Sequence, residues 1–199
     1  GGLCSDCIPA RLLSAQVKAA FDGDGPFLAL PVLDGVVVNM SPASTGCGGL
    51  LCSVKITVFV PKDPGDNEKQ KKVYEPTTAS EARPLVIFSP GFLIGRQRYL
   101  SYGERLASWG FVAVLWEPEH ELVPLRVNSH ETLARYVHDL VDWAYEQNST
   151  SDSPLYAQIN LTKGAMLVGH SRGAKANSLL AARCGMAHGS RGTMQQRGE

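Results

Sequence analysis

Three short runs of apolar residues stand out along the chain, at 85–88, 111–116 and 165–168. Each run is almost entirely apolar and too short for a typical helix, which indicates a strand buried on both faces of a sheet. Longer stretches with a helix-like spacing of apolar positions separate these runs and follow the last one. The alternation of strand and helix from residue 85 onward predicts a mostly parallel sheet with helices on both faces, an α/β fold.

Two of the helical stretches carry start and stop signals. Ser101 and Glu104 have the spacing of a capping box, and Gly110 is placed to end the helix that they begin. Asn128 is placed to cap the next helix, with Glu131 at its third position. The buried stripe predicted for this second helix is Leu133, Val137, Leu140, Val141 and Ala144.

Two earlier stretches, 27–38 and 52–60, have the composition of β-strands. In the second, every other residue is an aliphatic one, as expected for a half-buried strand. The aliphatic positions are Val54, Ile56, Val58 and Val60, and Ser53, Lys55, Thr57 and Phe59 alternate with them. The glycine-rich segment 46–49 predicts a loop between the two. We therefore expect an antiparallel pair at one edge of the sheet.

Composition divides the chain into three parts. Residues 1–25 are an N-terminal extension, 26–184 are the N-terminal part of an α/β domain, and the glycine-rich residues 185–199 are expected to be a disordered tail. Within the domain, 61–84 holds several prolines and a dense, balanced set of charges, which predicts a solvated loop.

The segment 169–173 has the sequence Gly-His-Ser-Arg-Gly and lies between the last predicted strand and a helix predicted for 174–182. Such a pattern between a strand and a helix is typical of a nucleophile elbow, which lifts the serine side chain clear of the sheet. Ser171 is then expected to have a strained backbone, and Gly169 and Gly173 to fit where the turn leaves no room for side chains. Ser171 is the predicted nucleophile; an ordinary glycine-flanked turn is the alternative.

A serine hydroxyl needs a base to take its proton, and the oxyanion that forms needs hydrogen-bond donors. The backbone N–H of Arg172, directly after the nucleophile, is one predicted donor. The second is expected in the loop after an earlier strand, and Phe92 is the candidate, because Gly91 allows close approach and Pro90 stiffens the turn. A plain Pro-Gly turn stays open as the other interpretation.

Charge and hydropathy exclude some classes of protein. The chain has 19 basic and 19 acidic side chains and no net charge, which argues against a nucleic-acid binder. Hydrophobic residues make up 44% of the chain, enough for a real core, and no apolar run approaches the roughly 18 residues that span a bilayer. The first residue is a glycine, so the lack of a targeting peptide says nothing about compartment.

The five cysteines are Cys4, Cys7, Cys47, Cys52 and Cys184. The spacings of the first four fit no common zinc pattern, and no histidine lies near either pair, so no metal is expected. A disulfide within or between the pairs and free thiols both stay open.

Residues from about 85 to 184 resemble the α/β-hydrolase fold. The arginine after the nucleophile in 169–173 resembles the lipase motif of chlorophyllases of plants and green algae. The segment 85–92 resembles their strand and Gly-Phe oxyanion loop, although Pro90 stands where that family usually has His, and 108–112 resembles their helix-to-strand junction. The Ser-Pro-Gly-Phe turn also resembles that of bacterial cutinases and polyester hydrolases, which usually carry Met after the nucleophile. The arginine therefore favours chlorophyllase.

This resemblance implies a carboxylic-ester hydrolase that converts chlorophyll and water to chlorophyllide and phytol. It implies a lipidic ester or chlorophyll-like substrate, a chloroplast setting, and no metal or other cofactor. It leaves room for peripheral contact with a membrane, and a secreted protein is the alternative location. Nucleic acid is not an expected partner, and the oligomeric state is open.

The triad of this fold runs serine, acid, histidine in chain order. After Ser171 the sole acid is Glu199 and the sole histidine is His188, both in the predicted tail. The strands that should carry the acid and the base are absent from the sequence. We therefore expect a hydrolase chain truncated after the nucleophile helix, inactive and poorly stable alone.

The remaining histidines are weaker candidates for the base. His120 follows the strand 111–116 and so belongs near the reactive edge, but nothing in the sequence orients it. His130 and His138 belong to a helix and are expected on its surface or flank. His170 is expected to point away from the nucleophile and to be packed.

Two classes of function follow. One is an ester hydrolase, chlorophyllase-like or else cutinase-like or another lipid esterase. The other is a catalytically inactive α/β-hydrolase-like protein that binds a lipidic ligand or a partner.

Overall fold

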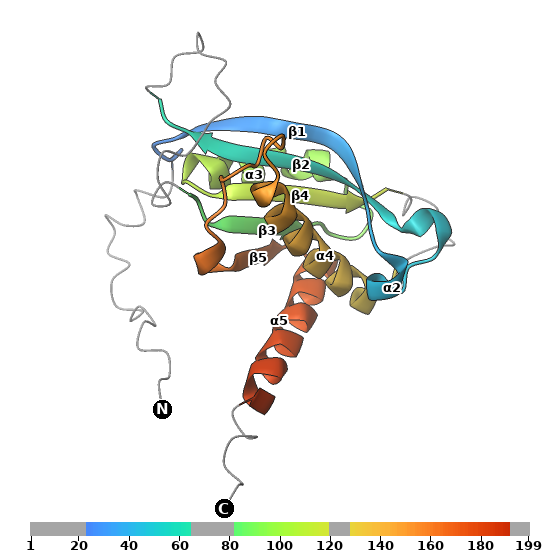
Figure 1. Cartoon of the computed structure of the whole chain (residues 1–199). Coiled ribbons are helices and arrows are strands. Elements are labelled where there is room, and N and C mark those ends of the chain that lie inside the picture. Colours follow the sequence, from blue (N-terminus) through green and yellow to red (C-terminus); the bar gives the residue numbers. More distant parts are fainter. Residues whose placement is uncertain (1–22, 65–81, 120–127, 192–199) are drawn as a thin grey trace, which may run out of the picture.

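The computed structural model describes residues 23–64, 82–119 and 128–191, and contains one five-stranded sheet. The strands lie side by side in the order β1-β2-β4-β3-β5 (Figure 1). Their bounds are β1 (Leu28–Asn39), β2 (Ser53–Lys62), β3 (Leu85–Ser89), β4 (Val112–Pro118) and β5 (Ala165–Gly169). The α-helices are α2 (Pro42–Thr45), α3 (Leu100–Ser108), α4 (His130–Ser149) and α5 (Arg172–Arg191), with short 3-10 helices η1 (Gly49–Leu51), η2 (Arg96–Tyr99) and η3 (Leu161–Lys163).

The sheet combines an antiparallel half with a parallel half. β1 pairs with β2, and β2 with β4, in antiparallel register, so the pair expected at the edge is present. β3 pairs in parallel with β4 on one side and β5 on the other, and Ser89 stands opposite Gly169 in that register. The carboxyl ends of β3 and β5 therefore meet at one edge of the sheet, where a parallel α/β sheet carries its reactive loops.

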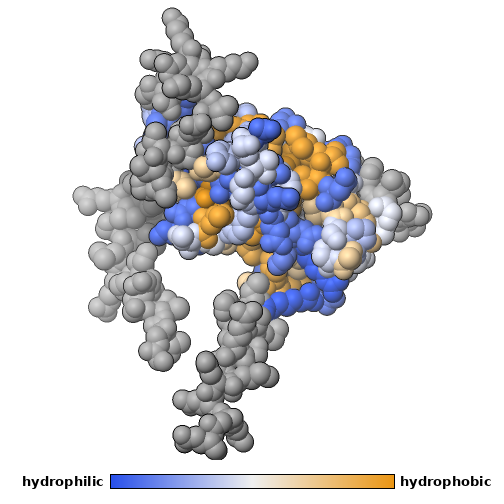
Figure 2. Space-filling model, viewed as in Figure 1, coloured by the Kyte–Doolittle hydropathy of each residue, from blue (hydrophilic) through white to orange (hydrophobic). Residues whose placement is uncertain are grey.

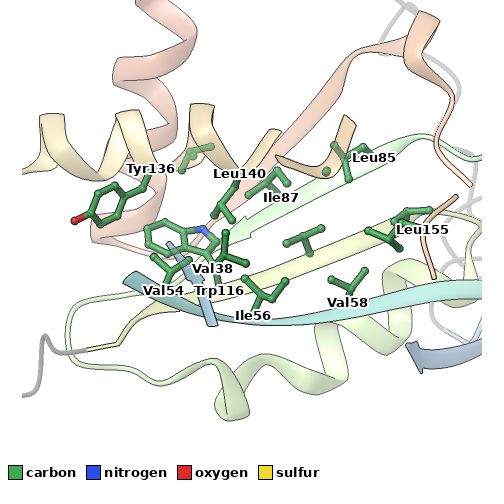
Figure 3. Close-up of a cluster of buried hydrophobic side chains, with 14 of the residues drawn as sticks. Val38, Val54, Ile56, Val58, Leu85, Ile87, Trp116, Tyr136, Leu140 and Leu155 are labelled. Atoms are coloured by element: carbon green, nitrogen blue, oxygen red, sulfur yellow. The ribbon is translucent and has the colours of Figure 1, made fainter. Parts of the chain in front are cut away.

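Both faces of the sheet are covered, which confirms the predicted α/β class. The larger hydrophobic cluster lies between the sheet and the helices α4 and α5, and it includes Ile56, Ile87 and Leu140. Figure 3 shows Trp116 from β4 and Tyr136 from α4 in this cluster, and their ring centroids lie 6.2 Å apart. A smaller cluster lies on the other face, under α3. Of the stripe predicted for α4, all residues are fully buried except Val141, which is half-buried.

β2 is more deeply buried than the alternation predicts. Val54, Ile56 and Val58 face the large cluster, but Thr57 and Phe59 on the other face are also buried. Phe59 belongs to the cluster under α3, and the Thr57 hydroxyl donates to Asp34 Oδ1 over 2.7 Å. The strand is central rather than half-exposed because β4 and β1 flank it and α3 crosses its second face.

The helix ends differ from two of the predictions. Ser101 does not cap α3, because α3 begins at Leu100, directly after η2, with Tyr99 at the cap position. Asn128 does not cap α4, because Ser129 does so by accepting from the N–H of Thr132. Gly110, in contrast, ends α3 as predicted: its φ is 91°, and the N–H groups of residues 110 and 111 return to carbonyls of the last helical turn.

Part of the tail predicted at 185–199 is helical. α5 continues to Arg191, so residues 185–191 are helical rather than disordered. A glycine inside a helix costs only about 1 kcal/mol relative to alanine, which is too little to end a helix by itself. Residues 1–22 of the extension predicted at 1–25, residues 65–81 of the predicted charged loop and residues 192–199 lie outside the described residues.

The surface mixes polar and apolar side chains, with an apolar area beside β1 (Figure 2). Leu28, Leu30, Val36 and Val37 of this edge strand are exposed. None of the helices in the described ranges is both long and apolar enough to cross a bilayer.

Candidate active site

The turn between β5 and α5 holds Ser171 in a strained conformation. Its φ is 50°, in the left-handed region, and among the described residues only Leu93 and Ala157 share this feature without being glycine. A left-handed backbone costs a residue with a side chain about 1–2 kcal/mol. Strain of this kind clusters at functional sites, where the surrounding structure holds it in place. The Ser171 side chain is exposed at the carboxyl edge of the sheet.

The glycines that flank Ser171 fill positions with no room for a side chain. A Cβ on Gly169 would lie 2.7 Å from the backbone nitrogen of Ala174. A Cβ on Gly173 would lie 2.3 Å from the carbonyl oxygen of Ser89. Backbone atoms on the far side of each contact cannot swing away as a flexible side chain would. The turn therefore packs directly against the end of β3.

A buried polar network joins this turn to the sheet. The Ser89 hydroxyl donates to Asn177 Oδ1 over 2.8 Å and accepts from the Trp116 indole N–H over 3.2 Å. The Asn177 side-chain amide donates to the carbonyl of Val168 over 2.9 Å. These bonds hold β3, β4 and the second turn of α5 in one arrangement, with their polar groups satisfied inside the core.

Tyr99 connects the loop after β3 to the turn before α5. Its hydroxyl accepts from the N–H of Gly91 over 3.0 Å and lies 2.8 Å from Nδ1 of His170. The hydroxyl accepts from Gly91 and keeps its own proton, which it can donate to Nδ1 of His170 when that nitrogen is unprotonated. His170 is thus hydrogen-bonded but exposed, and not packed as the sequence predicts. A Cβ on Gly91 would lie 2.6 Å from His170 Nδ1, so the glycine is required for this contact.

The two loops border an open hollow of about 540 Å³. It is lined by Phe92, His130, Ser171, Arg172 and Lys175. The predicted nucleophile and the two residues predicted to supply oxyanion donors therefore lie at one place. The catalytic roles of these residues stay predictions.

His130 and Lys175 are residues of this hollow that the sequence interpretation missed. His130 begins α4, and Lys175 lies in the first turn of α5, four positions after Ser171. Partial burial, followed by the charges of Lys175 and Arg172, lowers the pKa of His130 below its ordinary value of 6.5. The sequence did contain a pattern that could have pointed to Lys175. It lies four positions after Ser171, and residues four apart share a helix face.

The Arg172 side chain folds back over the rim of the hollow. Its guanidinium donates to the backbone carbonyl of Asn128 and lies 5.1 Å from the ring centroid of Phe92. Cations over aromatic rings at this distance attract each other. Asn128, predicted as a helix cap, instead supplies a carbonyl that orients Arg172.

The acid and the base of a triad are not assigned by the described residues. His120 and Glu199 lie outside them, and the side chain of His188 in α5 is likewise not described. His138 lies on the exposed flank of α4, as expected, where Nδ1 is 3.2 Å from the carboxylate of Asp142. The predicted truncation and inactivity are not tested by this arrangement and stay predictions.

Two of the cysteines form a disulfide, Cys47–Cys52, which removes them as metal ligands. Cys4 and Cys7 lie outside the described residues. Within the described ranges no three histidine, cysteine or acidic side chains gather in a way that could hold a metal ion.

Comparison with known proteins identifies the family. No match is found among the curated proteins. Residues 63–187, more than half of the chain, match the model of the PETase family, described as PET hydrolase-like. The matched range includes the loop after β3, the turn at Ser171 and most of α5. This is a family of carboxylic-ester hydrolases of the α/β-hydrolase type that act on polyesters, and the match supports the cutinase and polyester hydrolase resemblance rather than chlorophyllase. The chain belongs to the PET hydrolase-like family.

Proposed function

We propose that this protein hydrolyses carboxylic esters with Ser171 as the nucleophile. The observation that carries the proposal is the exposed, strained Ser171 in the same hollow as Phe92 and Arg172. In this reaction Ser171 Oγ bonds to the ester carbonyl carbon and its proton passes to a base. The alcohol leaves with that proton, and water then releases the acid from the acyl-enzyme.

The backbone N–H groups of Phe92 and Arg172 are proposed to stabilise the oxyanion. The N–H of Phe92 has no acceptor within the described residues, so it is available to a substrate. Its position is supported by the neighbouring N–H of Gly91, which Tyr99 holds. Each oxyanion donor is typically worth about two to three powers of ten in turnover.

For the substrate we propose a polyester or a cutin-like ester rather than chlorophyll. The family match and the Ser-Pro-Gly-Phe turn support this choice. The chlorophyllase interpretation depended on the arginine after the nucleophile. The Arg172 side chain has a structural explanation in its contacts with Asn128 and Phe92, so its presence does not require chlorophyll.

The experiment offers four substrates to a full-length version that includes the triad acid and base: a p-nitrophenyl ester of a short acid, one of a long acid, a polyester film and chlorophyll. We expect ester and polyester hydrolysis by this version that is lost in Ser171→Ala. Residues 1–199, which are predicted to be inactive alone, are assayed beside it. Ser178→Ala is the matched control, because Ser178 is an exposed serine of α5 whose hydroxyl donates to the carbonyl of Ala174 in the same helix. Release of phytol without polyester hydrolysis would favour the chlorophyllase-like candidate. Ligand binding without turnover of any ester would favour the inactive binding protein.

We also propose an oxidising compartment, with a secreted protein favoured over a chloroplast one. The Cys47–Cys52 disulfide supports this location, because such bonds form and persist in oxidising environments. Thiol alkylation of the protein in its native extract tests it. Free Cys47 and Cys52 in the extract would argue against secretion.

A further inference from the structure

The hollow at Ser171 is bordered by positive charge on its α5 side. Arg172 and Lys175 line it, and none of the described residues that line it is acidic. Glu131, next to His130 on α4, is turned toward Arg183 further along α5, with 3.6 Å between the charged atoms. The reacting ester group would therefore sit beside two cations, with no carboxylate among the described lining residues to offset them.

The side chains of Arg172 and Lys175 differ in the contacts that restrain them. Arg172 is held by the carbonyl of Asn128 and by the ring of Phe92. Lys175 is exposed, and its ammonium has no carboxylate partner in the part of the chain that the structure describes. An ammonium on a flexible stem that lacks an internal partner is available to an anion from outside.

The pKa of His130 is sensitive to the positive charge of these two side chains. Besides partial burial, Lys175 and Arg172 are the groups that lower its pKa. A field that disfavours a third positive charge at His130 favours a negative charge at the same place. Phe92, which also lines the hollow and is 46% exposed, offers an aromatic surface for the hydrocarbon part of a ligand.

We propose that this site prefers esters that carry a free carboxylate on the acyl side, the half-esters of dicarboxylic acids, and that Lys175 is the residue that selects them. The inference rests on the proposed function of Ser171 and narrows its substrate class. In such a complex the ester carbonyl lies at Ser171, the hydrocarbon lies on Phe92 and the carboxylate faces Lys175. Partial hydrolysis of a polyester creates carboxylate-ended fragments of this type, so the preference suits later steps of its breakdown.

Binding is measured in the Ser171→Ala chain, so that no turnover interferes. Monomethyl adipate, an anion, and dimethyl adipate, its neutral counterpart, are titrated while the ring resonances of His130 are followed by NMR. We expect the half-ester to bind about 3- to 10-fold more tightly at low ionic strength, in line with one or two charge pairs at partly exposed distances. The difference should nearly vanish at 1 M salt, where the Debye length is about 3 Å.

Charge variants locate the effect. In Lys175→Gln the preference for the half-ester should fall to less than about 2-fold. Lys163→Gln is the matched control, since Lys163 is an exposed lysine before the opposite end of β5, and it should leave the preference intact. Equal affinity for the two esters, or a preference that survives Lys175→Gln, would overturn the inference.

A turnover assay of both adipate esters with the unmodified serine separates this inference from the proposed function. Hydrolysis of both at equal kcat/KM, abolished by Ser171→Ala, would support the proposed function and overturn the charge preference. Failure to hydrolyse either ester, with half-ester binding still dependent on Lys175, would overturn the proposed function and support the anion site.

Discussion

A Cβ placed on Gly173 would lie 2.3 Å from the carbonyl oxygen of Ser89, the last residue of β3. The same oxygen accepts a hydrogen bond from the N–H of His170, so it cannot move without disturbing the turn that presents Ser171. The close approach of these two residues sets the distance between the two loops of the site.

Gly173→Ala should therefore destabilise the protein and reduce ester turnover. Forcing a methyl group into such a contact costs about 1–3 kcal/mol of unfolding free energy. Urea unfolding measures this loss. Gly48→Ala is the control, since a Cβ there meets no atom within 4 Å and the φ of Gly48 is −129°, and we expect a change of less than about 0.5 kcal/mol. A neutral effect of Gly173→Ala would show that the turn is not packed as described.

Tyr99→Phe tests the connection between the two loops. The substitution leaves the N–H of the buried Gly91 without its acceptor, which costs about 1–3 kcal/mol of stability. It also loosens the neighbouring Phe92, so kcat should fall about 10- to 100-fold while KM changes little. Tyr102→Phe, at a residue of α3 that is 57% exposed, should change neither quantity. A normal kcat in Tyr99→Phe would remove Tyr99 from the account of the oxyanion loop.

Asn177→Ala tests the buried polar network. The substitution removes the acceptor of the Ser89 hydroxyl proton and the side-chain donor to the Val168 carbonyl, while the bond from Trp116 to Ser89 remains. The buried Ser89 proton then lacks an acceptor unless water enters, so we expect a loss of about 1–3 kcal/mol in the free energy of unfolding. Ser178→Ala, one position along α5 and exposed, is the control. If the two variants unfold at the same urea concentration, the network does not stabilise the turn.

The pKa of His130, measured by NMR, should lie below 6.5. Lys175→Gln should raise the pKa by removing one of its charges, and Lys163→Gln should not. The carboxylate of the adjoining Glu131 would raise the pKa of His130, but its pairing with Arg183 weakens that effect. Since the folded protein binds this proton less readily than the unfolded chain, the contribution of His130 to stability should decline as the pH falls below 6.5. A pKa above 6.5 would contradict the positive field in the hollow.

Much of the fold follows from local patterns. The runs at 85–88, 111–116 and 165–168 are short and apolar, and each forms a strand of the parallel half of the sheet. Gly110 ends α3 as predicted because only a residue without a side chain adopts its φ of 91° cheaply. The cap of α4 was misplaced by one residue because Asn128 and Ser129 can each begin a helix. The start of α3 was misplaced because the helix follows η2 directly, with Tyr99 at the cap position and no side-chain capping bond to mark it.

The site was only partly predictable. Ser171, Phe92 and Arg172 belong to motifs with a fixed spacing, so the sequence could predict them as site residues. The structure places the three at one hollow, and their catalytic roles stay predictions. His130 and Lys175 were missed because their relation depends on how α4 packs against α5, which no local pattern encodes. The Cys47–Cys52 pairing was likewise one of several open alternatives until the fold brought the two residues together.

The most direct test of the central claim is covalent labelling with a fluorophosphonate probe, followed by mass spectrometry of the digested protein. A serine that acts as an ester-cleaving nucleophile bonds to the phosphorus and displaces fluoride. The account predicts one label, on Ser171, that is present in Ser178→Ala and absent in Ser171→Ala. A label on another residue, or no label on a folded protein, would contradict the assignment of Ser171 as the nucleophile.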